Sequence, residues 1–211
     1  MAYDYKKAFP DLYLPKTRPS TLQVPSMNFF MVDGKGDPNS EEFQNAVSLL
    51  YGLCFTIKMS PKKNEAPKGY FEYVVPPLEG LWWIEGGKGF SFYERENWRW
   101  TLMIRQPEFV DSEVYQWALE ALKFKKPEKD WSQTRFEAYN EGLCVQMMHI
   151  GPYATEPETV AKMEEYASEQ GLVSTITTSG KHHEIYLSDP RKANPKTMKT
   201  VLRQPVKKAE A

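Results

Sequence analysis

The side chain best suited to chemistry is Glu184, in the segment 181–187 (KHHEIYL). The composition of this segment predicts a β-strand, in which successive side chains point to opposite faces of the sheet. Glu184 then shares a face with Tyr186, and the apolar Ile185 and Leu187 share the other. We expect the apolar face to pack beneath helices and Glu184 to point to the opposite face. There it is either an ordinary solvent-facing glutamate or the polar group of a pocket, acting as a general base or a counter-ion.

The histidines and cysteines are not spaced as metal ligands. His182 and His183 are adjacent, so a strand directs them to opposite faces, where they cannot easily share an ion. Cys54 and Cys144 do not form a pair with zinc spacing. The sequence also lacks a nucleotide-binding glycine loop and a nucleophile elbow. We therefore expect no metal ion and no cofactor.

Aromatic residues form the second notable group, with 11 Phe, 6 Trp and 12 Tyr among 211 residues. In the predicted strands, Trp98 and Trp100 share one face, whereas Trp82 and Trp83 point to opposite faces. Some rings fill the core, and we expect others to line a groove on the open face of the sheet, because exposed Trp is costly. Ring faces attract positive charge, so an acidic, ring-lined groove favours cations or flat, electron-poor ligands.

The charge distribution argues against nucleic acid as a partner. The formal net charge is -1, yet the last 21 residues hold seven basic side chains and one acidic one, so the rest of the chain is acidic. Phosphate binding needs a basic surface, and the C-terminal lysines are better explained as guards of a solvated edge strand. The sequence shows no apolar run of membrane-spanning length and no secretory signal, which predicts a cytoplasmic protein with reduced cysteines. Whether it is a monomer or a homodimer stays open.

Residues 1–26 contain four prolines and are expected to form an irregular lead-in to a single domain at residues 27–211. Three helices are predicted in that domain at residues 38–60, 111–126 and 155–171, where apolar side chains recur every three or four positions. Strands are predicted at residues 27–33, 70–75, 81–85, 89–93, 98–106, 135–139, 143–150, 183–187 and 200–206.

Residues 27–110 and 134–206 repeat the order strand, helix, strand, strand, and the helix at 111–126 links them. Both copies close on Arg-Gln-Pro, at 105–107 and at 203–205. This pattern predicts an α+β fold built from duplicated βαββ units. We expect an antiparallel sheet with helices on one side and a ligand cleft between the two halves.

Two short motifs resemble those of the GyrI-like small-molecule-binding domain family. They are 149–153 (HIGPY), followed by a helix, and 184–190 (EIYLSDP), followed by a strand that ends in Pro-Val. Together with the βαββ repeat, the resemblance covers about residues 27–206. Relatives include the effector-binding domains of multidrug-sensing transcription regulators and the bacterial DNA gyrase inhibitor protein. This sequence shows no helix-turn-helix region, so a DNA-binding regulator is not expected.

The stretch 74–83 (VVPPLEGLWW) is similar to that of a stand-alone branch of the family, the cyclopropanoid cyclopropyl hydrolases. These enzymes open the strained cyclopropane ring of DNA-alkylating natural products of the yatakemycin and duocarmycin type. The resemblance implies that Glu184 is the functional carboxylate and that Tyr153 and Tyr186 are walls of the binding site.

Hydrolysis of this kind would need a base, stacking rings and a donor for the developing oxyanion. Glu184 would deprotonate a water molecule that attacks the cyclopropane carbon. The rings expected to stack on the flat substrate are Trp82 or Trp83, Trp100 and Tyr153. The expected hydrogen-bond donor to the dienone oxygen is a tyrosine hydroxyl, of Tyr70 or Tyr73, or the imidazole of His149.

Two other functions remain open at this stage. The protein could bind or sense cationic hydrophobic drugs without chemistry, with Glu184 as their counter-ion. It could also act through another protein, as the gyrase inhibitor does, although no feature of this sequence specifically favours that role.

Overall fold

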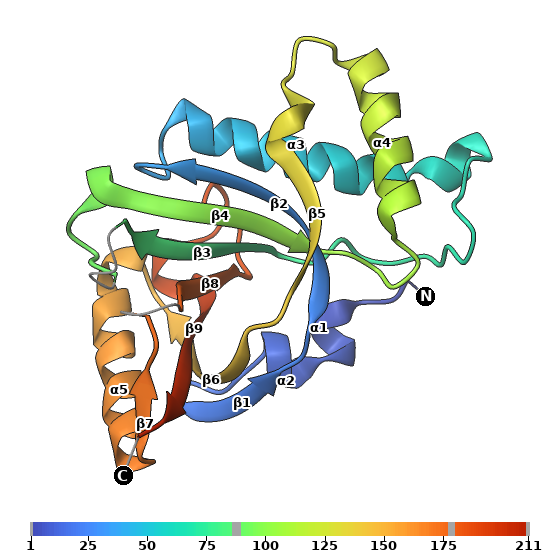
Figure 1. Ribbon diagram of the computed structural model, residues 1–211. Coiled ribbons are helices and arrows are strands. Elements are labelled where there is room, and N and C mark those ends of the chain that lie inside the picture. The colour runs from blue at the N-terminus through green and yellow to red at the C-terminus, as the bar shows by residue number, and fades with distance from the viewer. Residues whose placement is uncertain (1, 86–89, 177–179, 210–211) are drawn as a thin grey trace.

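The computed structural model describes residues 2–85, 90–176 and 180–209 (Figure 1). The helices of this part of the chain are α1 (Tyr5–Ala8), α2 (Pro10–Tyr13), α3 (Glu41–Lys58), α4 (Ser112–Lys125) and α5 (Glu156–Glu169), with short 3-10 turns that include η4 (Tyr153–Thr155). The strands are β1 (Ser20–Val24), β2 (Met27–Lys35), β3 (Leu78–Ile84), β4 (Trp98–Arg105), β5 (Thr134–Tyr139), β6 (Gly142–Ile150), β7 (Leu172–Ser174), β8 (His182–Tyr186) and β9 (Lys199–Lys208).

The sheet is antiparallel, and its main path runs β1-β6-β9-β8-β3-β4-β2-β5, with β7 added beside β9. The predicted α+β duplication is confirmed, because β2-α3-β3-β4 and β6-α5-β8-β9 have the same order of elements. In each copy the last strand lies between the other two. The middle strands β3 and β8 pair with each other and so join the two copies.

Two long bent strands also cross from one copy into the other. β1 leads directly into β2, and β5 leads directly into β6. The pairs Val24–Gly142 and Met27–Tyr139 belong to a single antiparallel register, so these two bent strands run side by side along their length. The strand order begins with β1 and ends with β5, so these two bent strands connect its opposite ends. The sheet therefore curves round and has an inner and an outer face (Figure 1).

The outer face of the sheet carries α3 over one copy and α5 over the other (Figure 1). Ser40 is the N-cap of α3, and its side chain accepts a hydrogen bond from the backbone N–H of Phe43. Its apolar stripe packs on β2, β3 and β4 around Trp82 and Trp100. The helix α5 packs on β6 and β9 through a separate apolar cluster that includes Leu202.

The inner face holds a small apolar cluster and a group of buried polar side chains. The apolar cluster consists of Phe29, Met31, Leu81 and Met103. At one end of this face, the one-turn helices α1 and α2 pack against Ile185. Both faces of the central strands are therefore covered.

Several elements differ from the sequence-based predictions. Residues 1–26 are not irregular, since they contain α1, α2 and β1. Residues 70–75 form no strand, and Tyr73 makes an isolated bridge to Tyr3 instead. Of the strand expected at 89–93, Gly89 lies outside the described residues and the remainder forms turns. These segments are short, so packing overrides their weak local preference.

The three longer helices lie within three residues of their predicted limits. Across the described ranges, no helix combines the length and the apolar character that crossing a membrane requires.

Candidate functional site

Glu184 lies at the centre of a row of side chains on the outer face. Leu102, Gly80, Glu184 and Leu202 lie opposite one another on β4, β3, β8 and β9. Leu102 belongs to the apolar cluster beneath α3, and Leu202 to the one beneath α5. Glu184 therefore lies between the two helices, beside a glycine whose missing side chain makes room for the side chains of Trp82 and Tyr186. The prediction that Glu184 points away from the helices is wrong, because Ile185 packs on α1 and α2, which the sequence did not reveal.

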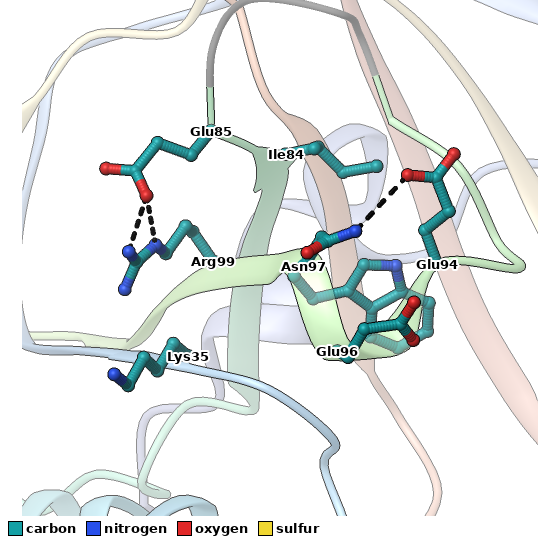
Figure 2. Close-up of a pocket in the computed structure, with 8 residues that line it drawn as sticks. Lys35, Ile84, Glu85, Glu94, Glu96, Asn97 and Arg99 are labelled. Carbon is teal, nitrogen blue, oxygen red and sulfur yellow. Dashed lines mark hydrogen bonds and ion pairs between the residues drawn. The ribbon is translucent and has the colours of Figure 1, made fainter.

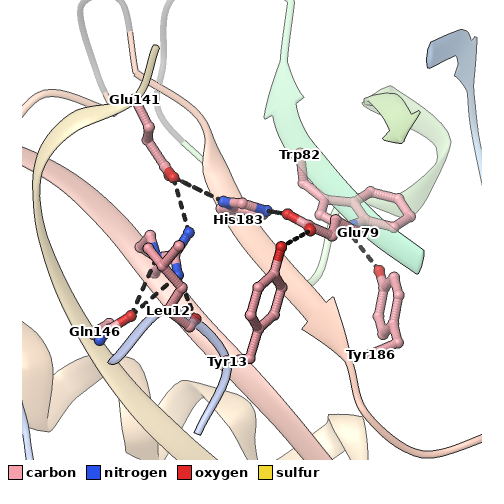
Figure 3. Close-up of polar contacts among 9 residues, drawn as sticks. Leu12, Tyr13, Glu79, Trp82, Glu141, Gln146, His183 and Tyr186 are labelled. Carbon is pink, nitrogen blue, oxygen red and sulfur yellow. Dashed lines mark hydrogen bonds and ion pairs between the residues drawn. The ribbon is translucent and has the colours of Figure 1, made fainter. Parts of the chain in front are cut away.

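The Glu184 carboxylate is held by a chain of two hydrogen bonds. The Tyr186 hydroxyl donates to Oε2 of Glu184 at 2.7 Å, so the predicted common face of these two residues is confirmed. The indole Nε1 of Trp82 donates to the Tyr186 hydroxyl at 3.0 Å (Figure 3). Burial, followed by the charge of Glu184, raises the pKa of Tyr186 well above its usual value. The phenol therefore stays protonated and continues to donate.

A second carboxyl group, Glu156, approaches Glu184 from the first turn of α5. Its side chain is buried, and one of its carboxyl oxygens lies within 4.8 Å of a carboxyl oxygen of Glu184. Burial and the adjacent Glu184 raise the pKa of Glu156 well above its usual value. Burial and the neighbouring carboxylate therefore both favour the protonated form of Glu156. Its Oε1 atom has no hydrogen-bond partner among the described residues.

His182 is the third polar group of the site and is fully buried. Its Nε2 atom lies 3.3 Å from Oε1 of Glu184, but neither ring nitrogen forms a hydrogen bond within the described structure. The ring stacks on Phe90 at 4.8 Å and meets the edge of Phe92 at 5.5 Å. A buried imidazole without partners costs stability, so it is available to a ligand.

Aromatic rings surround these polar groups on two sides. Towards α3, Trp82 stacks on Phe43 with a centroid distance of 5.9 Å and meets Trp98 edge-on at 5.3 Å. Towards α5, Tyr153 meets Tyr186 edge-on at 6.1 Å. Tyr153 is 36% exposed and so forms the solvent-facing side of the site.

One group of potential metal-binding side chains occurs in the described ranges. Glu156, His182 and Glu184 each offer a donor atom within 4.8 Å of the others. Metal ligands must be deprotonated, whereas burial beside Glu184 favours the protonated form of Glu156, and Glu184 already accepts a hydrogen bond from Tyr186. The arrangement fits an organic ligand better, and we do not identify these residues as metal ligands.

Three further predicted site residues do not form walls of the site. Trp100 is fully buried in the core, edge-on to Phe43, and is not a wall of the site. Trp83 points to the opposite face from Trp82, where Nζ of Lys181 lies 3.7 Å from its ring centroid. The imidazole of His149 is buried against Thr159 at 2.9 Å and the carbonyl of Pro152 at 3.2 Å, so its role is to hold the start of α5.

Tyr70 and Tyr73 are not brought to Glu184 either. They lie in an aromatic cluster with Phe109, on the side of the sheet covered by α1 and α2. The Tyr70 hydroxyl donates to the backbone carbonyl of Lys58 at 3.0 Å. The reason is that residues 70–75 run outside the main sheet, so a strand alternation cannot be applied to them.

The inner face contains a separate buried network around His183 (Figure 3). His183 contacts Glu79 through Nε2 at 3.0 Å and Glu141 through Nδ1 at 3.0 Å. Arg203 donates to Glu141 at 3.2 Å. The prediction that His182 and His183 point to opposite faces is thus correct. With its charges paired and its atoms enclosed, this network stabilises the fold.

A hollow of about 420 Å³ opens where β3 ends and β4 begins (Figure 2). Its lining is mostly charged, and the ion pair between Arg99 and Glu85 satisfies two of its side chains. Glu184 does not line it. We therefore place the candidate site at Glu184, where unpaired buried polar atoms and aromatic rings occur together.

The family model of the GyrI-like small molecule binding domain matches residues 17–207. The chain belongs to this GyrI-like family. An uncharacterized conserved protein from Listeria innocua is 51% identical, with a TM-score of 0.91 over 97% of this chain and 100% of that one. A protein from the same organism described as a hydrolase is 48% identical, with a TM-score of 0.89 over 97% and 100% of the two chains. A further Listeria innocua hydrolase is 49% identical, with a TM-score of 0.90 over 98% and 100%. A search of curated proteins gave no match.

Sequence reasoning missed Glu156, His182 and Phe43 as members of this GyrI-like site. For His182 the signal was present, because it lies two residues before Glu184 in the predicted strand and therefore points to the same face. Glu156 is one of several glutamates along α5, and nothing in its local sequence distinguishes it. Its position depends on how α5 packs over β8.

Proposed function

We propose that this GyrI-like protein binds flat aromatic molecules between α3 and α5 and hydrolyses the cyclopropane ring of DNA-alkylating toxins. The observation that carries the proposal is Glu184, a nearly buried carboxylate held by Tyr186 and surrounded by rings. Two Listeria innocua proteins, 48% and 49% identical to this chain and described as hydrolases, support hydrolysis over binding alone. The role would be detoxification in the cytoplasm, without a cofactor.

The proposed reaction adds one water molecule to a spirocyclopropyl dienone. Glu184 accepts a proton from the water while its oxygen attacks the cyclopropane CH₂ group. The carbon–carbon bond to the spiro centre breaks, and its electron pair moves into the ring to form a phenolate. The phenolate then takes a proton, which balances the one removed from water. Relief of ring strain supplies part of the driving force.

The oxyanion requires a hydrogen-bond donor, and Tyr153 is the best-placed phenol in the described structure. Burial, followed by the charges of Glu184 and Glu156, raises the pKa of Tyr153, so its hydroxyl stays protonated. Its partial exposure leaves it accessible to a ligand. Tyr153 therefore replaces Tyr70, Tyr73 and His149 as the proposed donor.

Mass spectrometry of a duocarmycin-type dienone after incubation with the protein tests this function. We expect a product heavier by one water molecule from the wild type, and none above background from Glu184→Gln. Glu164→Gln, which changes an exposed glutamate on α5, is the matched control and should retain full turnover. Equal turnover by Glu184→Gln would remove Glu184 as the base.

A specific observation also favours the second candidate, a binder or sensor of cationic hydrophobic drugs. Among the described residues, no lysine or arginine forms an ion pair with Glu184. The imidazole of His182 lies beside the carboxylate instead. A buried carboxylate without a fixed cation is a suitable counter-ion for a cationic ligand. Recovery of an unaltered ligand after long incubation, with binding weakened in Glu184→Gln, would support this function over hydrolysis.

A further inference from the structure

We infer that Glu156 and Glu184 share a single proton in the ligand-free protein, and that an aromatic cation entering the site displaces this proton into solvent. The inference rests on the proposed binding of ligands at Glu184 and assigns a role to Glu156. Glu156 would adjust the charge of the site to that of its occupant.

The geometry brings two carboxyl groups together in a place that water barely reaches. Glu156 is 2% exposed and Glu184 is 8% exposed. They come from α5 and β8, and the packing of this helix on the sheet brings their carboxyl oxygens within 4.8 Å of each other. Oε1 of Glu156 has no hydrogen-bond partner in the described structure and remains available to a ligand.

Among the residues that the structure describes, the groups that face this pair do not include a lysine or an arginine. They are His182 and Tyr186 from β8, Tyr153 from η4 and His149 from β6. Two adjacent carboxylates without a cation would repel each other strongly in this desolvated setting. One retained proton removes this repulsion and gives the protonated group a donor for a charge-assisted hydrogen bond. Burial and Glu184, which raise the pKa of Glu156, act in the same direction.

A ligand cation changes this balance because it supplies the missing positive charge. Glu156 can then ionise, and its proton passes to the buffer. A neutral dienone supplies no charge, so the pair keeps its proton and Glu184 remains the single base. One site can therefore accept both neutral and cationic flat molecules.

Fluorescence titration with ethidium, a flat aromatic cation, tests the displacement. Release of one proton predicts that the affinity of the wild type rises with pH, by up to about tenfold for each pH unit over the range in which the ligand-free pair holds its proton. In Glu156→Gln, which cannot release a proton, the affinity should be nearly independent of pH. Any pH dependence that His182 contributes would remain in this variant, which distinguishes it from the pH dependence due to Glu156. Glu164→Gln should follow the wild type.

Infrared spectroscopy of the ligand-free protein tests the shared proton directly. We expect the carbonyl band of a protonated carboxylic acid at neutral pH in the wild type and in Glu164→Gln, and its loss in Glu156→Gln. Absence of the band from the wild type, or its persistence in Glu156→Gln, would overturn the shared proton. A flat pH profile in the wild type, or no binding of ethidium at any pH, would overturn the displacement. Neither result depends on dienone hydrolysis, so failure of the hydrolase function is recognised separately.

Discussion

Tyr186 and Glu184 are two residues apart on β8, and the hydroxyl of the first donates a 2.7 Å hydrogen bond to the carboxylate of the second. The same hydroxyl accepts from the indole of Trp82 on the neighbouring strand. One phenol thus fixes the position of the carboxylate and links it to the aromatic wall beneath α3. All three of these side chains come from strands of the sheet.

Replacing Tyr186 with Phe removes the hydrogen bond to Glu184 and leaves the Trp82 indole without its acceptor. We expect ligand affinity or dienone turnover to fall about tenfold, and the free energy of unfolding to fall by about 1–2 kcal/mol. Titration with ethidium and chemical denaturation measure the two effects. Tyr93→Phe, at a position 86% exposed, is the control and should change neither. Unchanged affinity and turnover in Tyr186→Phe would show that the carboxylate does not need this donor.

Replacing Gly80 with Ala should disturb the same hydrogen bonds, because Gly80 lies directly against the two side chains that form them. A Cβ atom at Gly80 would lie 2.7 Å from Nε1 of Trp82 and 2.9 Å from the hydroxyl of Tyr186, so these side chains must move. We expect a loss of about 1–3 kcal/mol in stability and weaker ethidium binding. A double-mutant cycle with Tyr186→Phe provides the check, because the two binding effects should be smaller together than their sum. Full additivity would mean that Gly80→Ala acts elsewhere.

The inner network makes the stability depend on pH through His183. Burial alone would lower the pKa of His183, but the Glu141 and Glu79 carboxylates outweigh it and raise the pKa from 6.5 to about 9. A raised pKa means that the stabilisation is fully present below about pH 6.5 and is lost as the pH rises through about 9. The wild type should therefore lose stability on the order of a few kcal/mol across this range, as measured by urea denaturation at a series of pH values.

In His183→Gln this alkaline loss should disappear, and the variant should be less stable at neutral pH because Glu141 loses a charged partner. At the acid end, burial opposes ionisation of Glu141, but His183 and Arg203 lower its pKa from 4.5 to about 2. The corresponding stabilisation is present above about pH 4.5 and is lost as the pH falls through about 2. An alkaline slope in His183→Gln equal to that of the wild type would assign it to other groups.

Trp100 should behave as a core residue rather than as part of the site. It is fully buried and contacts Phe43 edge-on at 5.2 Å. Trp100→Phe should reduce the free energy of unfolding by about 1–3 kcal/mol and change ethidium affinity by less than about threefold. In contrast, Trp82→Phe should weaken binding more than it weakens the fold, because the Trp82 indole is hydrogen-bonded within the site. The reverse ranking would return Trp100 to the ligand wall.

The duplicated fold could be predicted because its signals are local and repeated. Apolar side chains at three- and four-residue spacing marked α3, and Asp111 caps α4 through hydrogen bonds to the backbone N–H groups of Glu113 and Val114. The Arg-Gln-Pro sequence occurs in the last strand of both copies. It begins at the last residue of β4 and lies within the longer strand β9. The one-turn helices α1 and α2 and the short strand β1 lie among the N-terminal prolines and carry too little periodicity to be recognised in the same way.

By itself, the sequence determined that Glu184 and Tyr186 share a face of β8 and that His182 and His183 do not share one, because the side chains of any strand alternate. Only the tertiary structure decided which of these faces the helices α3 and α5 cover. Alternation divides the side chains into two sets, but here both faces are packed, so hydrophobicity does not say which elements lie above each set. The contact between Glu156 and Glu184 has the same origin. It depends on how α5 packs across the sheet, and residues distant in the chain leave no local pattern of such a contact.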